Sequence, residues 1–325
     1  MREDACVQQT PELEQEWDDF TRSLARKGRS AATIAIYRKS FDSFWGWAET
    51  EGVTDPADVT HRTINSWTDW MLTQPARRGG RIQYDVDPET GARTERKVST
   101  NTLRIRWQNL RPFFSWWAEE TERPNPFDRA DTPAIDEQPT PVVSIDDVRA
   151  LLHACNGKTF INRRDTALVR FLYDTGARVG EVAAMTLDSW DRRADVVTLA
   201  GKTGTRHVPI SPSTGEALAR YTRERKTHPR ARLAAFWLGP KGALTEGGVA
   251  QVLYRLCDRA DIPRIHPHQL RHTWAHQMKT ADASTDDLMA LGGWKSPQMV
   301  TRYGKSAQIA RAHDRARNIA LGDQL

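Results

Sequence analysis

A proline-rich stretch near the middle of the chain constrains the fold more than any other feature of the sequence. Residues 124–143 contain five prolines and show no apolar period. Proline removes a backbone donor and interrupts helices and sheets, so such a stretch is typical of a semi-extended linker. The sequence therefore predicts two domains, residues 1–128 and 144–325, joined by a linker over 129–143. A chain of 325 residues is long enough for both.

The composition excludes several classes of protein. No run approaches 18 apolar residues, so no membrane-spanning helix is expected. The first residues are acidic and lack the apolar core of a signal peptide. Three cysteines, Cys6, Cys155 and Cys257, lie far apart and form neither a disulfide framework nor a CxxC metal site. We expect a cytoplasmic protein with no membrane partner.

The charge is divided unevenly along the chain. Residues 1–140 hold 19 lysines and arginines against 24 acidic residues, whereas residues 141–325 hold 28 against 18. An excess of positive charge in one half suggests an anionic partner, and nucleic acid is the commonest one. Charge alone is weak evidence, because many basic domains are merely solvated.

Apolar spacing predicts a helical N-terminal domain. Residues recur at i, i+3 and i+4 over 13–27, 30–51, 58–74 and 99–120. Between the last two, residues 77–98 are polar with a DPETG turn, which predicts a hairpin or a long loop. Eight of the twelve tryptophans lie in this half. Their helical spacing favours a core role over base stacking.

A basic cluster lies on the first two predicted helices of this otherwise acidic domain. Such a face can contact DNA phosphates or can simply be solvated, and the sequence leaves both interpretations open. The candidate DNA-binding residues are Arg22, Arg26, Lys27, Arg29, Arg38 and Lys39.

The C-terminal half is predicted to be mostly helical with one small sheet. Residues 194–200 and 205–211 are expected to pair as a hairpin around Gly201–Gly204. The helices are expected at 161–175, 180–187, 212–226, 246–259, 267–279, 284–291, 297–303 and 305–320. The predicted fold class is therefore mostly α with a small β-sheet, in which a helical domain precedes a mixed but mainly α domain.

Two short motifs in this half carry candidate catalytic residues. In TGARVGEVAAM, at 175–185, Arg178 and Glu181 stand three residues apart at a helix start, a spacing that also fits an ordinary surface ion pair. In HPHQLRHTWAHQM, at 266–278, His268 and Arg271 face the same way on one helix.

A zinc site is an alternative interpretation of the second motif. His268, His272 and His276 recur every four residues. Arg271 would place a cation beside the metal, and no HExxH pattern is present, so we favour no metal site.

Taken together, four segments resemble the tyrosine recombinase (phage integrase) family. They are TGARVGEV, AGKTGTRHVPI, HPHQLRHTWA and LGGWKSPQMVTRY, and the resemblance spans roughly residues 144–320. Residues 29–52 are also similar to the family's helical, SAM-like core-binding domain. The resemblance implies that residues 1–128 bind DNA and that residues 144–325 form the catalytic domain.

The resemblance implies a role for each matched residue. Arg178 and Arg271 correspond to the two catalytic arginines, and Glu181 to the acidic residue that supports them. Lys202 corresponds to the lysine at the hairpin tip, and His268 to the histidine of the H-x-x-R pair. Trp294 stands where most members have histidine and some have tryptophan, and its indole can only donate its N–H or pack. Tyr303 corresponds to the nucleophile. Thr205 departs from the pattern, because a second basic residue is common there.

The chemistry of these residue types agrees with that assignment. Two guanidinium groups can bind the non-bridging phosphate oxygens, a role that a metal fills in other enzymes. Lys202 can act as a general acid, and His268 can help to accept the tyrosine proton. Attack by Tyr303 leaves a 3′-phosphotyrosine that stores the phosphodiester energy, so rejoining needs neither ATP nor another cofactor.

The sequence thus predicts a site-specific DNA recombinase. The resemblance implies a homotetramer on double-stranded DNA carrying recombination sites, and a nucleoid-associated, cytoplasmic location. It also implies a simple Cre- or Xer-like architecture, because few residues precede the first helix. The alternatives are a type IB topoisomerase, a telomere resolvase, or a DNA-binding relative without catalytic activity. Residues 305–325 are expected to form a tail helix that docks on its own domain or on a neighbouring subunit.

Overall fold

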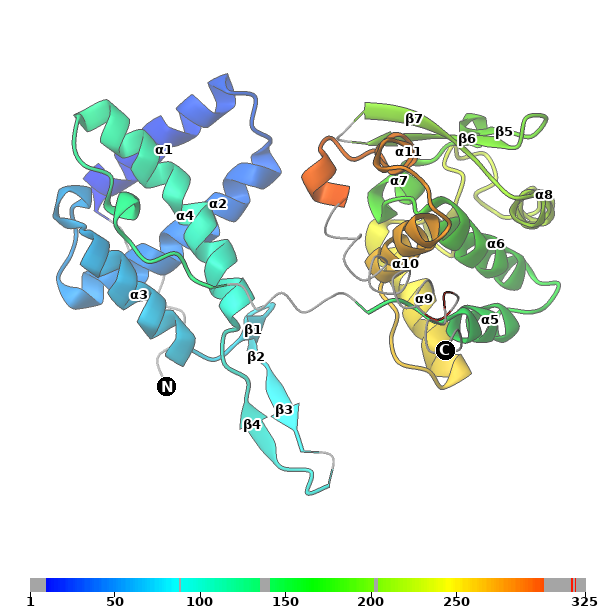
Figure 1. Ribbon diagram of the computed structural model, residues 1–325, viewed down its shortest axis with the longest axis horizontal. Helices are drawn as coiled ribbons and strands as arrows, with labels where there is room; N and C mark the ends of the chain where they lie inside the picture. Colours follow the sequence, from blue (N-terminus) through cyan, green and yellow to red (C-terminus); the bar gives the residue numbers. More distant parts are fainter. Residues whose placement is uncertain are drawn as a thin grey trace. The chain divides into compact units, whose positions relative to one another are not determined.

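The computed structural model describes residues 10–87, 89–134, 141–201, 204–300 and the two positions 317 and 319. The chain divides into two compact units, residues 1–138 and 139–325, which are described separately (Figure 1). Both are mainly helical with short antiparallel strands, so the predicted fold class is confirmed. In the described part of the chain, no helix is both long and apolar enough to cross a membrane.

Four α-helices build the described part of the N-terminal unit. They are α1 (Pro11–Arg26), α2 (Ala31–Ala48), α3 (His61–Thr73) and α4 (Thr100–Thr121). Each begins after a hydroxyl side chain that accepts a hydrogen bond from a backbone N–H of the first turn, supplied by Thr10, Ser30, Thr60 and Ser99. These caps satisfy donors that the helix itself leaves unpaired, which is why the helices begin there. The predicted helices agree with the observed ones to within three residues at each end.

The core of this unit is a cluster of aromatic rings. Helix α4 packs against α1, α2 and α3 (Figure 1). Phe44 lies between Trp45, Trp67 and Phe114, with ring centroids 5.1–5.6 Å apart and edge-to-face geometry. Seven of the eight tryptophans are buried, namely Trp17, Trp45, Trp47, Trp67, Trp107, Trp116 and Trp117. The expected core role of the tryptophans is therefore confirmed.

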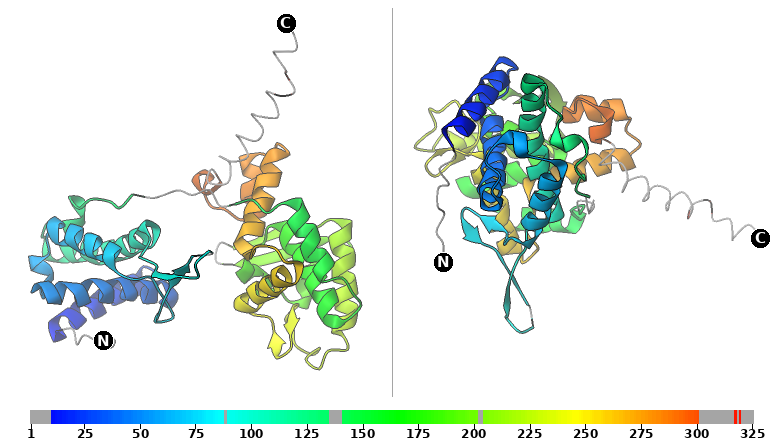
Figure 2. Two further views of the ribbon diagram at one scale, coloured as in Figure 1. Left: turned by 90° about the horizontal axis from the view of Figure 1, so that it is seen from below. Right: turned by 90° about the vertical axis from the view of Figure 1, so that its left-hand side faces the viewer.

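A β-ribbon leaves the helices between α3 and α4. Strand β1 (Arg77–Arg78) pairs with β2 (Arg81–Ile82), and β3 (Tyr84–Val86) pairs with β4 (Arg93–Glu95). The ribbon projects away from the helical bundle (Figure 1, Figure 2), and nearly all of its residues are exposed. Of the two possibilities predicted for residues 77–98, the structure shows the hairpin.

In the described residues of the C-terminal unit, seven helices of six or more residues pack together. The helices are α5 (Ile145–Ala154), α6 (Phe160–Thr175), α7 (Val179–Ala184), α8 (Pro212–Arg225), α9 (Glu246–Ala260), α10 (Pro267–Thr280) and α11 (Thr285–Gly292). Helix α6 is central and packs against α5, α8 and α10, and a small sheet contacts α7 and α11. Ser144 caps α5, as its position in the sequence predicts.

The larger of the two antiparallel sheets described in this unit has the strand order β5 (Trp190–Asp191), β6 (Val196–Gly201), β7 (Gly204–Pro209), and β8 (Leu238–Gly239) pairs with β9 (Gly242–Ala243) in the other. The β6–β7 hairpin is the one predicted, and Val197 and Val208 face each other in the core. Strands β5, β8 and β9 have two residues each, too few to show an apolar period, and were not predicted.

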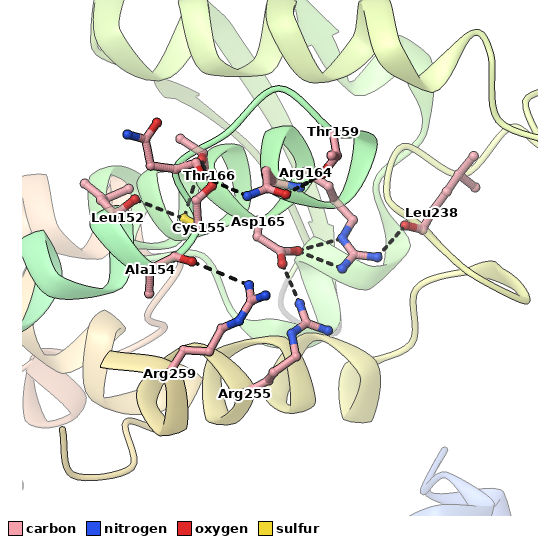
Figure 3. A network of polar contacts seen from close by, with 12 residues as sticks. Leu152, Ala154, Cys155, Thr159, Arg164, Asp165, Thr166, Leu238, Arg255 and Arg259 are labelled. Carbon is pink, nitrogen blue, oxygen red and sulfur yellow. Dashed lines mark hydrogen bonds and ion pairs between the residues drawn. The ribbon is translucent and has the colours of Figure 1, made fainter. Parts of the chain in front are cut away.

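A charged network is buried at the far end of α6 from α7. Asp165 is 1% exposed and accepts from Arg164, itself 2% exposed, and from Arg255 of α9 (Figure 3). Arg164 also donates to the Leu238 carbonyl oxygen at 3.1 Å. The network therefore ties α6 to α9 and to β8.

Candidate active site

Glu181 is the centre of the candidate site. Helix α7 begins directly after Arg178, whose backbone N–H donates to Glu181 Oε2 at 2.7 Å. The Arg178 side chain donates to Oε1 at 2.9 Å. Arg206 of β7 donates to both carboxylate oxygens, at 2.5 and 2.8 Å. A single carboxylate, only 3% exposed, therefore joins the start of α7 to the β6–β7 hairpin.

The two arginines keep this carboxylate ionised. Burial alone raises the pKa of Glu181, but hydrogen bonds and charge from Arg206 and Arg178 outweigh burial and lower the pKa to about 2. Glu181 is thus an anion at neutral pH. Its charge holds both guanidinium groups in place, because charge-assisted and bidentate pairs have strict geometry.

The turn after α11 anchors both of the predicted catalytic arginines. Arg178 Nη2 donates to the Gly293 carbonyl oxygen at 2.8 Å, and Arg271 Nη2 donates to the Gly292 carbonyl oxygen at 2.6 Å. Arg271 Nη1 also donates to the Gly176 carbonyl oxygen at 2.7 Å. Consecutive carbonyl oxygens therefore bring together two guanidinium groups that lie far apart in the sequence.

Both residues of this turn need to be glycine. Gly293 has a φ of +67°, and a Cβ there would lie 3.0 Å from Arg206 Nη1 and 3.2 Å from Arg178 Nη1. A Cβ on Gly292 would lie 2.1 Å from the Trp294 ring. A side chain at either position would push the arginines or the indole out of place.

Trp294 packs over Arg271. The Arg271 guanidinium lies 4.2 Å from the centroid of the indole ring, and Trp274 stacks on the Trp294 ring at 6.0 Å. Trp294 is 5% exposed and Arg271 is 2% exposed. Trp294 thus packs on a cation, one of the two roles that the sequence left open for it.

His268 lies one turn before Arg271 on α10 and is exposed. Partial burial, together with the charges of Arg271 and Arg178, lowers its pKa. Burial and two neighbouring histidines lower the pKa of His272 to about 4. His268 is therefore neutral at neutral pH and can accept a proton. Among the described residues, no group of three or more His, Cys, Asp or Glu side chains is arranged to hold a metal ion.

Lys202 and Tyr303 lie outside the described residues, as does the tail segment 305–325 apart from positions 317 and 319. The helix predicted over 297–303 is present over 297–300, where the described part ends. The structure thus brings together Arg178, Glu181, Arg271 and Trp294, with His268 one helical turn away.

Arg206 is a site residue that the sequence analysis missed. It is 9% exposed at its side chain, and it also donates to the Leu291 carbonyl oxygen at 2.6 Å. It pairs across the hairpin with Leu199 and shares a strand face with the buried Val208. The sequence signal that points to Arg206 is its place, as a charged residue, on the apolar face of the predicted strand 205–211.

The six residues of the basic cluster in the N-terminal unit fall into two groups. Arg22 pairs with Asp19, and Arg38 pairs with both Glu14 and Asp42. The remaining four members, Arg26, Lys27, Arg29 and Lys39, are exposed.

Residues 141–309 match the model of the phage integrase family. The chain belongs to this family, the tyrosine recombinases. The resemblance drawn from the four motifs is confirmed, as is the predicted activity of a site-specific recombinase, an enzyme that cleaves and rejoins DNA.

Named relatives extend the similarity over about nine-tenths of the chain. Tyrosine recombinase XerC of Roseiflexus sp. (strain RS-1) is 27% identical over 314 residues, covering 92% of this chain and 93% of that protein. Tyrosine recombinase XerD of Mycobacterium tuberculosis (strain ATCC 25618 / H37Rv) is 29% identical over 308 residues, covering 90% and 94%.

Solved structures share the fold of this recombinase. The Tn1549 transposon integrase in complex with transposon right end DNA has a TM-score of 0.70 at 17% identity, covering 94% of this chain and 99% of that one. The lambda integrase dimer bound to a core site has a TM-score of 0.63 at 16% identity, covering 90% and 76%.

Proposed function

We propose that this recombinase cleaves DNA with Tyr303 and stabilises the reacting phosphate with Arg178 and Arg271. The observation that carries the proposal is the pair of consecutive carbonyl oxygens, at Gly292 and Gly293, that anchors both guanidinium groups. Fixed cations placed where negative charge develops are the largest single source of catalysis in many enzymes.

The two arginines serve the phosphate differently. Arg178, with 29% of its side chain exposed, has room to bind a phosphate oxygen while Glu181 and Gly293 hold it from the other side. Arg271 is buried under Trp294 and adds positive charge from a site of low dielectric, where charge acts more strongly than in water.

The proposed cleavage step is a transesterification. The Tyr303 oxygen attacks phosphorus and loses its proton, with His268 as the acceptor. The bond from phosphorus to the 5′-oxygen breaks, and Lys202 protonates the departing oxygen. The products are a 3′-phosphotyrosine and a free 5′-hydroxyl group. Attack by a 5′-hydroxyl group on the phosphotyrosine reverses the step and joins the new strand without a cofactor.

The finer features of assembly are also part of the proposal. Recombination exchanges strands between two duplexes, and four cleavage sites require four copies of a protein with one nucleophile each. We propose a homotetramer on double-stranded DNA, acting in the cytoplasm at the nucleoid. The N-terminal unit binds the DNA, and the C-terminal unit carries the chemistry.

Trapping of the covalent adduct tests the proposed function. The full chain is incubated with a library of nicked duplexes, and adducts are isolated and mapped by peptide mass spectrometry. We expect a phosphotyrosine at Tyr303 in the wild type and none in Tyr303→Phe, which should still bind DNA. Tyr84→Phe, on the exposed ribbon of the N-terminal unit, is the matched control and should form adducts normally.

Two results would refute this assignment. An adduct that persists in Tyr303→Phe would show that another residue is the nucleophile. A wild-type protein that binds duplex DNA but never forms an adduct would instead be a binding relative without catalytic activity.

A further inference from the structure

The tight turn between β1 and β2 carries the sequence Arg-Arg-Gly-Gly-Arg. Arg77 and Arg78 precede Gly79 and Gly80, and Arg81 follows them. All five residues are exposed. The turn lies at the root of the ribbon, where the chain passes from α3 toward α4 (Figure 1).

Arg78 and Arg81 face each other directly across the two strands. Like charges in this position repel and destabilise a strand pair. Among the described residues, neither guanidinium has a carboxylate within ion-pair distance. The ribbon thus holds two cations together at a cost in stability, a cost that a bound anion between or beside them would remove.

The backbone of the turn is open to a close approach. Gly79 and Gly80 have φ values of +57° and +77°, and a Cβ built on either would meet no atom within 4 Å. Arg77 Nη1 donates to the Gly80 carbonyl oxygen at 3.1 Å and so braces the turn. An exposed glycine backbone beside arginines lets a phosphate reach main-chain N–H groups that a side chain would otherwise shield.

The outer part of the ribbon has the opposite charge. Residues 84–96 contain four acidic residues and two arginines. One of these arginines, Arg96, pairs with Asp85 at 2.5 Å. Positive charge is therefore concentrated at the root of the ribbon, and the tip is not suited to an anion.

We propose that the Arg77–Arg81 turn is a DNA-contact arm that binds the phosphate backbone of the duplex held by this recombinase. Duplex DNA is the occupant that fits, because it presents closely spaced phosphates to a pair of adjacent guanidinium groups. The inference rests on the proposed function, since it assigns a further contact with the same DNA. The arm increases the affinity for DNA and fixes the position of the protein along the duplex, and it takes no part in bond cleavage.

The salt dependence of DNA binding tests the arm. The double variant Arg78→Gln/Arg81→Gln keeps an unbranched polar side chain at both positions and removes the two charges. Its matched control is Arg93→Gln, an exposed arginine in the acidic outer ribbon. The probe is a fluorescein-labelled duplex of random sequence and about 40 base pairs, long enough to cover the protein's phosphate contacts.

We expect the slope of log Kd against log salt to fall by about two in the double variant, because each lost phosphate contact removes about 0.9. The control should leave the slope unchanged. The control should keep the wild-type melting temperature, and the double variant should melt at that temperature or slightly above it, because the repulsion between the two cations is gone. An unchanged slope in the double variant, or an equal fall in the control, would overturn the proposal.

A failure of the proposed arm and a failure of the proposed recombination chemistry give different results. The rate of covalent adduct formation at saturating protein should be the same in wild type and double variant, because the arm touches no reacting atom. A tenfold loss of that rate in the double variant would also overturn the arm as proposed. A wild type that forms no adduct would refute the recombination chemistry and leave the salt-slope result standing.

Discussion

The two units of this recombinase fill their interiors with different chemistry. Among the described residues, the N-terminal unit buries aromatic rings and only three polar side chains, Ser23, Ser40 and Thr68. The C-terminal unit buries five charged side chains, namely Arg164, Asp165, Glu181, Arg225 and Arg271. Burying a charge is costly unless partners compensate it, so each buried charge in the second unit calls for a specific reason.

Four of the five buried charges of the C-terminal unit belong to two networks with different roles, whereas Arg225 donates to backbone carbonyl oxygens such as those of Phe236 and Leu233. The Asp165 carboxylate and Arg164 are buried, and the partly exposed Arg255 completes a network that ties α6 to α9. The cluster around Glu181 opens toward solvent through Arg178 and His268. We infer that the first network serves stability and the second serves the reaction. The aromatic core of the N-terminal unit serves shape alone.

The largest effect is expected from removing a catalytic cation. Arg271→Ala should slow adduct formation by about 10²–10³-fold in single-turnover assays, because an electrostatic donor to the transition state is lost. Arg149→Ala removes an arginine that pairs with Asp146 on the surface and should leave the rate unchanged. A near-normal rate in Arg271→Ala would remove this residue from the site and weaken the contrast between the units.

The next largest effect is expected in the Asp165 network. Asp165→Asn leaves Arg164 buried without its carboxylate and should destabilise the C-terminal unit by about 3–5 kcal/mol. Hydrogen exchange with mass spectrometry in urea measures the stability of each unit separately. The N-terminal unit should keep its protection, and Asp146→Asn on the surface is the control. Loss of adduct formation in the folded fraction of Asp165→Asn would contradict the division into stability and reaction.

A pH-dependent effect of about 2–3 kcal/mol is expected from Glu181. Its pKa is about 2 in the folded chain and close to 4.5 when unfolded. A lowered pKa stabilises the fold above pH 4.5, and that stabilisation disappears as the pH falls toward 2. Glu181→Gln should therefore be less stable than wild type at pH 7 and approach it at low pH.

Urea unfolding at pH 7 and pH 3 measures this difference. Glu216→Gln, which removes an exposed partner of Arg220, should differ little from wild type at either pH. A deficit in Glu181→Gln of the same size at both pH values would show that the carboxylate is not held ionised by its neighbours.

The smallest effect is expected in the aromatic core. Trp67 is fully buried, and its indole N–H has no hydrogen-bond partner among the described residues. Trp67→Phe loses packing area and also removes a buried donor without a partner, two effects that oppose each other. The N-terminal unit should lose less than about 1.5 kcal/mol in hydrogen exchange. A loss as large as that of Asp165→Asn would mean that the lost packing far outweighs the removal of the donor without a partner, and would contradict the expected small effect.

Much of the fold was predictable, because local patterns determine it. Apolar spacing and hydroxyl caps locate the helices, and the β6–β7 hairpin follows from its alternating residues. Strands of two residues have no pattern to detect, and their pairing depends on the packed unit.

The site was predictable only in part. The motifs point to Arg178, Glu181, His268 and Arg271, which the structure places on α7 and α10. The carbonyl anchors at Gly292 and Gly293 depend on segments that approach only after folding. Arg178 and Gly293, for example, are 115 residues apart. Arg206 was missed for the same reason, since its carboxylate partner lies on another element.

The central claim is that Arg206 keeps Glu181 ionised and thereby holds Arg178 for the phosphate. The pH dependence of adduct formation in Arg206→Gln tests it most directly, with Arg206→Lys as the conservative variant. Without Arg206, burial acts on Glu181 with less opposition and its pKa rises, so the carboxylate becomes neutral at mildly acidic pH.

The account predicts that Arg206→Gln loses activity at about pH 5–6, where wild type is still active, and that Arg206→Lys restores much of the difference. His268 titrates in all three proteins and does not produce this difference. If adduct formation falls at the same acidic pH in wild type and in Arg206→Gln, the account is contradicted, because the Glu181 carboxylate would then stay ionised without Arg206.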